Sequence, residues 1–253
     1  MERSKDIDKL TAARANDLFS LCDKYGSAVF SDFLDGYEQT VVLDTAPYPI
    51  GYSVVFFGGY HDAEKKIMGV FPDWYEPDPS QMPIVCYKVE GGFTRQLTHR
   101  DYLGTLMSLG ISSSKLGDIV VYDGYAYVFA HSDIGSYIKD NLKKIGNQGV
   151  TVTEISDFRD ITIERKYKTI GAVCASNRLD AAVGAAAGVS RSRSASLIAG
   201  GKVKLNHREI LKASEPVKQG DLLSIRGSGR FLIHSFDGET RKGRIHITLK
   251  QYI

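Results

Sequence analysis

The chain has 253 residues, of which 43% are hydrophobic and 25% are charged, which is the composition of an ordinary soluble globular protein with room for two domains. It contains no run of about 18 apolar residues, and its first ten residues, MERSKDIDKL, have no apolar core. The sequence therefore predicts neither a membrane span nor a secretory signal. The three cysteines are scattered and odd in number, which indicates reduced thiols in a cytoplasmic protein rather than disulfides or a cysteine zinc site.

The net charge of +2 conceals a strong asymmetry along the chain. Residues 162–253 carry 17 Lys and Arg against 7 Asp and Glu, whereas residues 1–161 carry 15 against 23. A basic C-terminal part favours an anionic partner such as nucleic acid, although a solvated basic surface without a partner has the same composition. The acidic N-terminal part leaves a protein partner as an open alternative.

The N-terminal part predicts a small α/β domain over residues 1–75. The expected elements are a helix over 5–25, a short helix over 28–34, and strands in TVVLD (40–44) and YSVVFFGGY (52–60). Four of the seven prolines lie in FPDWYEPDPSQMP (71–83), which predicts a linker to the next domain.

The middle of the chain, 82–158, has the element order β-α-β-β-α-β, which is that of a ferredoxin-like domain. The expected elements are strands over 83–89, 118–122, 125–130 and 150–155, a helix over 98–109, and a helix over 133–145 that ends at Gly146. Asp123-Gly124 predicts the tight turn of a hairpin between two of the strands. Thr98 and Asp101 form a capping-box pattern at the start of the first helix.

Residues 165–253 predict a third domain, which is basic. After a connecting segment over 160–172, the expected elements are helices over 178–187 and 190–199 and strands over 202–206, 222–227, 230–236 and 244–253. Ser190 is expected to cap the second helix, with Arg191 and Arg193 in its first turn. Cations there oppose the helix dipole by about a few tenths of a kcal/mol each, so we expect an anion such as phosphate at this helix end.

Basic and small polar residues of this third domain form the predicted RNA-binding site. Lys202 and Lys204 share one face of a strand because they are two residues apart. Small serine and glycine neighbours let a nucleic-acid backbone approach closely. The candidate RNA-binding residues from this pattern are Arg178, Ser190, Arg191, Ser192, Arg193, Lys202, Lys204, Arg226 and Arg230.

No catalytic residue, metal site or cofactor site is predicted. The six histidines lack the spacing of metal ligands. The Gly-x-Gly of RGSGRF (226–231) lacks the third glycine and the strand-to-helix setting of a dinucleotide site.

Two stretches of the basic domain carry a family resemblance. NRLDAAVGAAAGVSRSRSASLIAGGKVKLN (177–206), followed by VKQGDLLSIRG (217–227), resembles the ribosomal-protein-S4-like RNA-binding domain. The shared positions are Arg178-Leu179-Asp180, Ser190-Arg191-Ser192, Leu197-Ile198, Gly201, Val203, Asn206 and Gly220-Asp221. The resemblance implies RNA binding and adds Asn206 to the candidate residues. Ser194 and His207 depart from the family, which usually has Ala and Gly there.

A wider resemblance covers nearly the whole chain. HDAEKKIMGVFPDWYEP (61–77), LTHRDYLGTLMSLGI (97–111) and LGDIVVYDG (116–124), followed by the basic domain, resemble the YlmH-type bacterial proteins. The resemblance implies an α+β protein with a small N-terminal domain, a ferredoxin-like domain and an S4-like domain in that order. Ser112-Ser113-Ser114 depart from the family, which often has a basic residue after Leu-Gly-Ile.

The YlmH-type resemblance also implies a function. It points to a non-enzymatic, ribosome-associated RNA-binding protein of translation in the bacterial cytoplasm. Such a protein is expected to bind rRNA or tRNA on the large ribosomal subunit, in ribosome-associated quality control or in the rescue of obstructed peptidyl-tRNA complexes.

Two alternatives stay open. NRLDAAVG (177–184) is similar to the Gly-Arg-Leu-Asp motif of pseudouridine synthases, with Asp180 as the nucleophile. Val183 stands where that family tends to have Thr, and only 73 residues follow Asp180, which is too few for the catalytic sheet. The other alternative is an adaptor linked to cell division, in which the acidic ferredoxin-like domain binds a division protein or a ribosomal protein.

Overall fold

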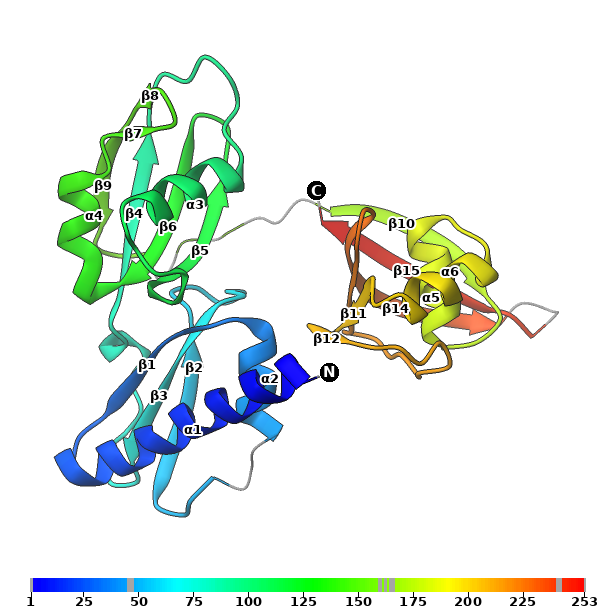
Figure 1. Cartoon of the computed structure of the whole chain (residues 1–253), viewed down its shortest axis with the longest axis horizontal. Coiled ribbons are helices and arrows are strands. Elements are labelled where there is room, and N and C mark those ends of the chain that lie inside the picture. The colour runs from blue at the N-terminus through cyan, green and yellow to red at the C-terminus, as the bar shows by residue number, and fades with distance from the viewer. Residues whose placement is uncertain are drawn as a thin grey trace. The chain divides into compact units, whose positions relative to one another are not determined.

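The computed structural model describes residues 2–44, 48–158, 161, 163, 167–239 and 243–252. The chain divides into two compact units, Met1–Ile163 (unit 1) and Glu164–Ile253 (unit 2), which are shown in Figure 1. Both units combine helices with antiparallel sheets, which confirms the α+β class. The division into three domains over 1–75, 82–158 and 165–253 stays a prediction. Within the described part, no helix is both long enough and apolar enough to span a membrane.

The first part of unit 1 is a three-stranded sheet packed against two helices. Its elements are α1 (Glu2–Tyr25), β1 (Val29–Leu34), α2 (Gly36–Asp44), β2 (Tyr52–Phe57) and β3 (Lys66–Pro72), with the strands in the order β1-β3-β2. The helix predicted over 5–25 and the strand predicted over 52–60 are confirmed. Apolar side chains of α1, including Leu18 and Cys22, pack against Met68 and Val70 of β3.

Two predictions for this part are wrong. Residues 28–34 were expected to be helical and contain β1, whereas 40–44 were expected to be a strand and form the end of α2. A short apolar run does not distinguish a strand from a buried helical turn by its periodicity. A capping box favours the helix α2 over a strand here, because Asp35 accepts the Glu38 backbone N–H at 2.9 Å and Glu38 accepts the Asp35 backbone N–H at 2.8 Å.

The second part of unit 1 has the predicted ferredoxin-like order. Its main elements are β4 (Ile84–Glu90), α3 (His99–Ser108), β5 (Leu116–Val121), β6 (Tyr125–His131), α4 (Gly135–Asn141) and β9 (Thr151–Ile155); three 3₁₀ turns cover Pro79–Gln81, Ser113–Lys115 and Ser132–Ile134. The antiparallel sheet has the order β5-β6-β4-β9. Gly124, with φ +82°, turns the predicted hairpin. The Asp101 carboxylate accepts the Thr98 N–H and hydroxyl at 2.8 and 2.7 Å, which confirms the capping box.

The helix predicted over 133–145 is shorter than expected. It ends at Asn141, and the next residues form a small hairpin of β7 (Lys144–Ile145) and β8 (Gln148–Gly149). Gly146 therefore lies in the turn of this hairpin and does not cap the helix. Leu142 and Ile145 are still buried, which explains why the apolar spacing continues past the end of the helix.

Shared packing joins the two parts of unit 1. Phe33 of β1 and Phe129 of β6 belong to one buried cluster. The Asp118 carboxylate accepts the Tyr60 hydroxyl at 2.6 Å and the Lys65 backbone N–H at 3.0 Å, and Lys65 Nζ donates to the Leu116 carbonyl at 2.6 Å. The predicted linker over 71–83 is anchored at both ends, because Phe71 of β3 and Met82 are buried in the same cluster.

One glycine of unit 1 sits where no side chain fits. A Cβ at Gly58 would lie 2.2 Å from the Lys65 carbonyl oxygen, so the backbone must move to accept one. We expect Gly58→Ala to lower the free energy of unfolding by roughly 1–3 kcal/mol, which is the usual effect of overpacking. The matched control is Gly92→Ala, because nothing lies within 4 Å of a Cβ there. Denaturant unfolding monitored by circular dichroism measures both, and equal stabilities would contradict the prediction.

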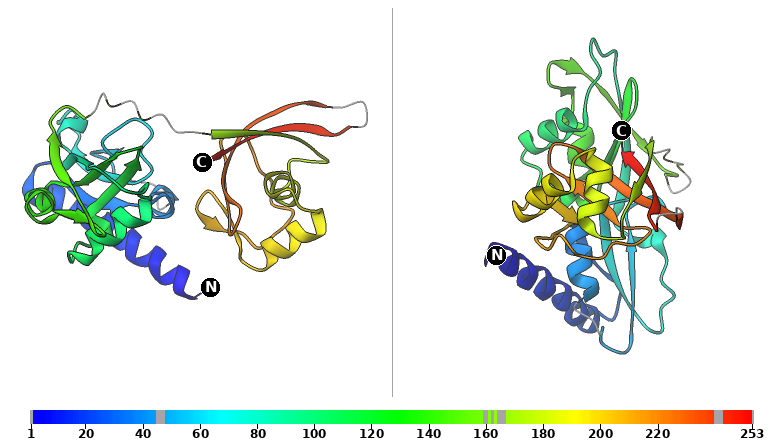
Figure 2. Two further views of the ribbon diagram at one scale, coloured as in Figure 1. Left: turned by 90° about the horizontal axis from the view of Figure 1, so that it is seen from above. Right: turned by 90° about the vertical axis from the view of Figure 1, so that its right-hand side faces the viewer.

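Unit 2 is a six-stranded antiparallel sheet with two helices on one side (Figure 2). Its elements are β10 (Tyr167–Cys174), α5 (Leu179–Ala187), α6 (Arg191–Ala199), β11 (Val203–Leu205), β12 (Arg208–Glu209), β13 (Leu222–Ile225), β14 (Gly229–Glu239) and β15 (Ile245–Tyr252). The strand order is β10-β15-β14-β13-β11-β12. Leu179 and Ile198 of the helices pack against Ile225, Phe231 and Leu249 of the sheet.

The predicted helices of unit 2 and its four predicted strands are present, but two strands were missed, the long β10 and the two-residue β12. Residues 160–172 were expected to be only a connecting segment, and part of this segment belongs to β10. β10 pairs along its whole length with β15, from Tyr167 opposite Tyr252 to Cys174 opposite Ile245. The partner strand is so distant in the sequence that no local turn signal announces the pairing.

Candidate nucleic-acid interface

The N-terminal end of α6 is held in place by small residues. Ser190 caps the helix as predicted, since its Oγ accepts the Arg193 N–H at 3.3 Å. Ser194 is fully buried and donates its hydroxyl to the Ser190 carbonyl at 3.1 Å. A Cβ on Gly184 of α5 would lie 3.1 Å from Ser194 Oγ, so the two helices approach closely here. This contact fixes where the first turn of α6 presents its side chains.

Asp180 of α5 holds two of the predicted arginines. Arg178 donates to both carboxylate oxygens of Asp180, at 3.2 Å from Nε and 3.1 Å from Nη2, and Arg191 Nε donates to Oδ2 at 3.0 Å. The Asp180 side chain is 6% exposed, whereas those of Arg178 and Arg191 are 40% and 55% exposed. The two guanidinium groups are therefore anchored from the inside and still reach solvent.

The ionisation of Asp180 follows from these contacts. Burial alone raises the pKa of its carboxyl, but the hydrogen bonds and charges of Arg178 and Arg191 outweigh burial. The pKa of Asp180 therefore lies below its ordinary value. The negative charge of Asp180 thus offsets part of the positive charge at the start of α6. The sequence alone did not show this, because it gave no carboxylate partner for Arg191.

Four other basic candidates have no such carboxylate partner among the described residues. Arg193, Lys202, Lys204 and Arg226 are exposed, and no carboxylate of the described part of the chain forms an ion pair with them. The two lysines alternate with Val203 and Leu205, which are buried, so they share the solvent side of β11 as predicted. These four cations are available to an anionic ligand.

The strand residues among the candidates line up across the sheet. Lys204 of β11 lies opposite Ser224 of β13, which lies opposite Arg230 of β14. The Arg226 backbone N–H donates to the Lys202 carbonyl at 2.9 Å, so these two residues are also neighbours. Opposed residues of an antiparallel sheet point to the same side. Lys202, Lys204, Arg226 and Arg230 therefore form one group, which we call the sheet group.

The structure thus separates the predicted residues into two groups. The helix-end group consists of Arg178, Ser190, Arg191, Ser192 and Arg193. The sheet group begins beyond the other end of α6, about 13 Å along a helix of nine residues. An RNA that contacts both groups must span this distance.

Asn206 has a different position from the other candidates. It forms the β11–β12 turn with His207, and both residues have positive φ, at +48° and +68°. Its side-chain amide donates to the Asp221 carboxylate at 2.9 Å and accepts the Leu222 N–H at 2.8 Å. Both ends of the amide are therefore used within the protein, and an RNA contact by Asn206 stays a prediction.

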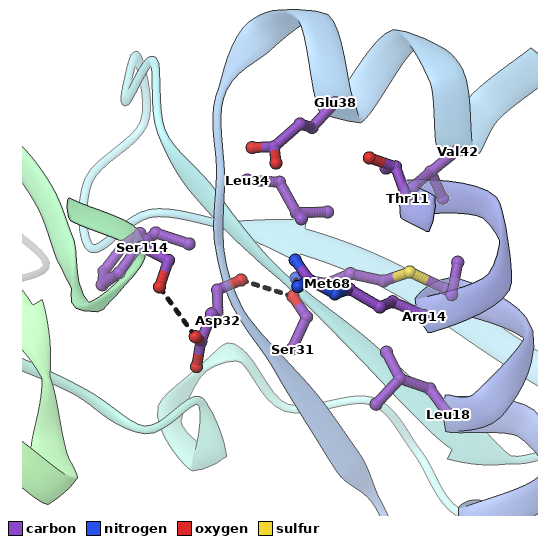
Figure 3. Close-up of a pocket in the computed structure, with 12 residues that line it drawn as sticks. Thr11, Arg14, Leu18, Ser31, Asp32, Leu34, Glu38, Val42, Met68 and Ser114 are labelled. Atoms are coloured by element: carbon purple, nitrogen blue, oxygen red, sulfur yellow. Dashed lines mark hydrogen bonds between the residues drawn. The ribbon is translucent and has the colours of Figure 1, made fainter. Parts of the chain in front are cut away.

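The structure has one notable hollow in unit 2 and one in unit 1. One of about 330 Å³ lies beside α5 and β10 and is lined by Asp180, Arg191 and Arg244 together with small apolar residues. The other, of about 280 Å³, lies in unit 1 between α1, β1 and α2 (Figure 3). Its lining combines aliphatic side chains with Arg14, Glu38 and Asp32, so it favours no single ligand chemistry. The described residues include no cluster of His, Cys, Asp and Glu that could hold a metal ion.

Sequence reasoning missed some residues around this interface. Asp180 was considered as a position shared with the S4-like domain and as a nucleophile, but not as an anchor, because that role depends on Arg191, which lies on the next helix. The tyrosines Tyr167 and Tyr252 were missed as well, although each lies within two residues of a lysine in a strand. Arg230 stacks on the ring of Tyr252, with its guanidinium carbon 4.8 Å from the ring centroid.

Comparisons with known proteins agree with this organisation. The family model "Putative RNA-binding domain in YlmH" matches residues 84–159, and the "S4 domain" model matches residues 178–223. The chain is 31% identical over 227 residues to "Ribosome-associated protein quality control protein P2" of Bacillus subtilis (strain 168), a match that covers 87% of this chain and 86% of that protein.

A solved structure supports the fold. "Cell division protein ylmH from Streptococcus pneumoniae" is 22% identical, with a TM-score of 0.52, and the match covers 61% of this chain and 94% of that chain. At this identity the likeness concerns the fold alone. The Bacillus subtilis relative matches most of both chains, and the two family models match unit 1 and unit 2 in turn. The chain therefore belongs to the YlmH family, with the YlmH-type domain followed by an S4 domain.

Proposed function

We propose that this protein is a non-enzymatic, ribosome-associated RNA-binding protein that grips rRNA or tRNA on the large subunit through unit 2. The observation that carries the proposal is the set of exposed cations without carboxylate partners, which are Arg193, Lys202 and Lys204 within the S4 match and Arg226 just after it. The name of the Bacillus subtilis relative supports a place in ribosome-associated quality control. Such work includes the rescue of obstructed peptidyl-tRNA complexes in the bacterial cytoplasm.

The two groups of unit 2 have different tasks in this proposal. At the start of α6, free backbone N–H groups and the Arg193 side chain bind a phosphate, and Arg191 adds a guanidinium held in place by Asp180. Lys202, Lys204 and Arg226 bind phosphates further along the backbone. Asn206 acts as a positioning residue, because it ties the β11–β12 turn to Asp221.

A pseudouridine synthase is disfavoured by the environment of Asp180. The carboxylate that would attack the base is almost fully buried and accepts hydrogen bonds from two arginines. A nucleophile must reach the substrate, and an anchored, buried carboxylate does not.

The test is co-sedimentation with ribosomal subunits in sucrose gradients at low and moderate salt. We expect the wild-type chain in the large-subunit fractions and Lys202→Glu/Lys204→Glu near the top, because two charges that attract phosphate become repulsive. The matched control is Lys9→Glu/Lys24→Glu, which reverses two exposed lysines of unit 1 that lie outside the RNA-binding-domain match over 84–159. Wild-type protein at the top of every gradient would reject the ribosome proposal, and equal sedimentation of all three proteins would reject the assignment of the lysines.

A further inference from the structure

The sheet of unit 2 has one face that α5 and α6 do not cover. Along its strands, inward residues such as Ile170, Phe231 and Leu249 are part of the core under the helices. The alternate residues point to the opposite side, where the exposed or half-buried side chains lie. We call this opposite side the open face.

A continuous row of polar and aromatic side chains crosses the open face. The strand registers place Lys204 opposite Ser224, Ser224 opposite Arg230, and Tyr252 opposite Tyr167. Arg230 lies over the ring of Tyr252 at 4.8 Å, which joins the two halves of the row. Residues from five strands, far apart in the sequence, therefore meet in one line across the sheet.

Rings and cations are paired within this row. The rings of Tyr167 and Tyr252 meet edge to face, with centroids 5.1 Å apart and planes at 70°. Lys250 Nζ lies 5.7 Å from the centroid of the Tyr167 ring, just as Arg230 lies over Tyr252. Each tyrosine thus has a cation beside it, which is the combination that binds single-stranded nucleic acid.

The charge on this side is strongly positive. Lys202, Lys204, Arg226, Arg230 and Lys250 are its cations. The carboxylates on the same side are Glu209 on the edge strand β12 and Asp237 near the far end of β14, and among the described residues neither forms an ion pair with Lys202, Lys204, Arg226 or Lys250. Asp237 is instead bonded to the hydroxyls of Ser235 and Thr248, at 2.5 and 3.4 Å.

We propose that the open face extends the RNA contact of the sheet group to unpaired nucleotides, with bases stacked on Tyr167 and on the Tyr252–Arg230 pair and phosphates bound by Lys204 and Lys250. The inference rests on the proposed function, because it extends the RNA contact from the sheet group to the tyrosines of β10 and β15. Unpaired nucleotides fit the surface better than a duplex, since the ring faces are useful only to bases that are not already stacked in a helix.

The experiment compares two probes on the full-length chain by fluorescence anisotropy. One probe is a short unstructured RNA, and the other is an abasic ribose-phosphate oligomer of the same length, which has the phosphates without the bases. For Tyr167→Ala/Tyr252→Ala we expect roughly 10- to 100-fold weaker binding of the RNA, because each stacked base contributes a large part of the affinity. Binding of the abasic probe should be unchanged, which also shows that the cationic face is still folded.

Matched variants complete the design. Tyr167→Phe/Tyr252→Phe keeps both rings and should bind the RNA within about twofold of wild type, as base stacking needs the ring and not the hydroxyl. Tyr25→Ala removes an exposed tyrosine of unit 1 that also has a lysine over its ring, at 5.4 Å, and should have no effect.

The outcomes separate this inference from the proposed function. RNA affinity that is unchanged in the double alanine variant overturns the inference and leaves the open face to a protein partner, while the proposed function stands. An equal loss on both probes also overturns the inference, because the tyrosines would then act only through folding. A wild-type chain that binds neither probe also overturns the inference, whereas the proposed function is decided separately by co-sedimentation with ribosomal subunits.

Discussion

Replacing Arg193, Lys202 and Lys204 together with alanine is expected to weaken the binding of structured RNA by roughly two to three orders of magnitude near 0.1 M salt. Each cation that neutralises a phosphate releases about 0.9 of a counterion from a duplex, so each contributes roughly tenfold at this salt concentration. The plot of log affinity against log salt should also become shallower by about three units. Filter binding over a series of salt concentrations measures both quantities.

The choice of these three residues follows from the structure. All three are exposed and have no carboxylate partner within the described chain, whereas Arg191 is paired with Asp180. The control is Lys9→Ala/Arg14→Ala/Lys24→Ala, which removes three exposed charges of unit 1 outside the RNA-binding-domain match over 84–159. A triple variant with the wild-type salt slope would show that these cations do not touch phosphate, even if its affinity had fallen.

Local patterns predicted what local interactions determine. The cap at Ser190, the capping box of Thr98 and Asp101 and the hairpin at Gly124 each involve residues within four positions of one another, and the structure has all three. The solvent side of Lys202 and Lys204 follows from the alternation of a strand in the same way.

Features that depend on distant partners could not be predicted. β10 is a strand because β15 pairs with it, and the two are separated by most of unit 2. The wrong predictions of a helix at β1 and a strand at α2 have a similar origin. β1 is a strand because it pairs with β3, and its own residue pattern does not indicate this. Tertiary context overrides local preference most easily in such short segments.

In the candidate site, too, local features were predictable and long-range features were not. The basic residues were visible in the sequence, but their arrangement into a helix-end group and a sheet group depends on the register of β11, β13 and β14. The ion pairs of Asp180 join residues of two helices, and Tyr167 and Tyr252 meet across two strands. A count of charges therefore located the RNA-binding domain without showing which cations are free.

Asp180→Asn is expected to lower the free energy of unfolding of unit 2 by about 1.5–3 kcal/mol at neutral pH. Asparagine has nearly the same shape but no charge, so the charge-assisted hydrogen bonds from Arg178 and Arg191 are weakened in a site that is almost closed to water. The control is Asp237→Asn, an exposed carboxylate of the same unit, which should change stability by less than about 0.5 kcal/mol. Chemical denaturation measures both variants.

The pH dependence identifies the charge as the cause. The pKa of Asp180 is lowered in the folded chain, so its ionised form stabilises the fold above the ordinary carboxyl pKa of about 4. That contribution is lost as the pH falls through the lowered pKa of the folded state, because the carboxyl then takes up a proton. The difference in stability between wild type and Asp180→Asn should therefore be constant near neutral pH and shrink below about pH 4. A difference that is the same at every pH would mean that packing of the side chain, and not its pairing with the two arginines, is what Asp180 contributes.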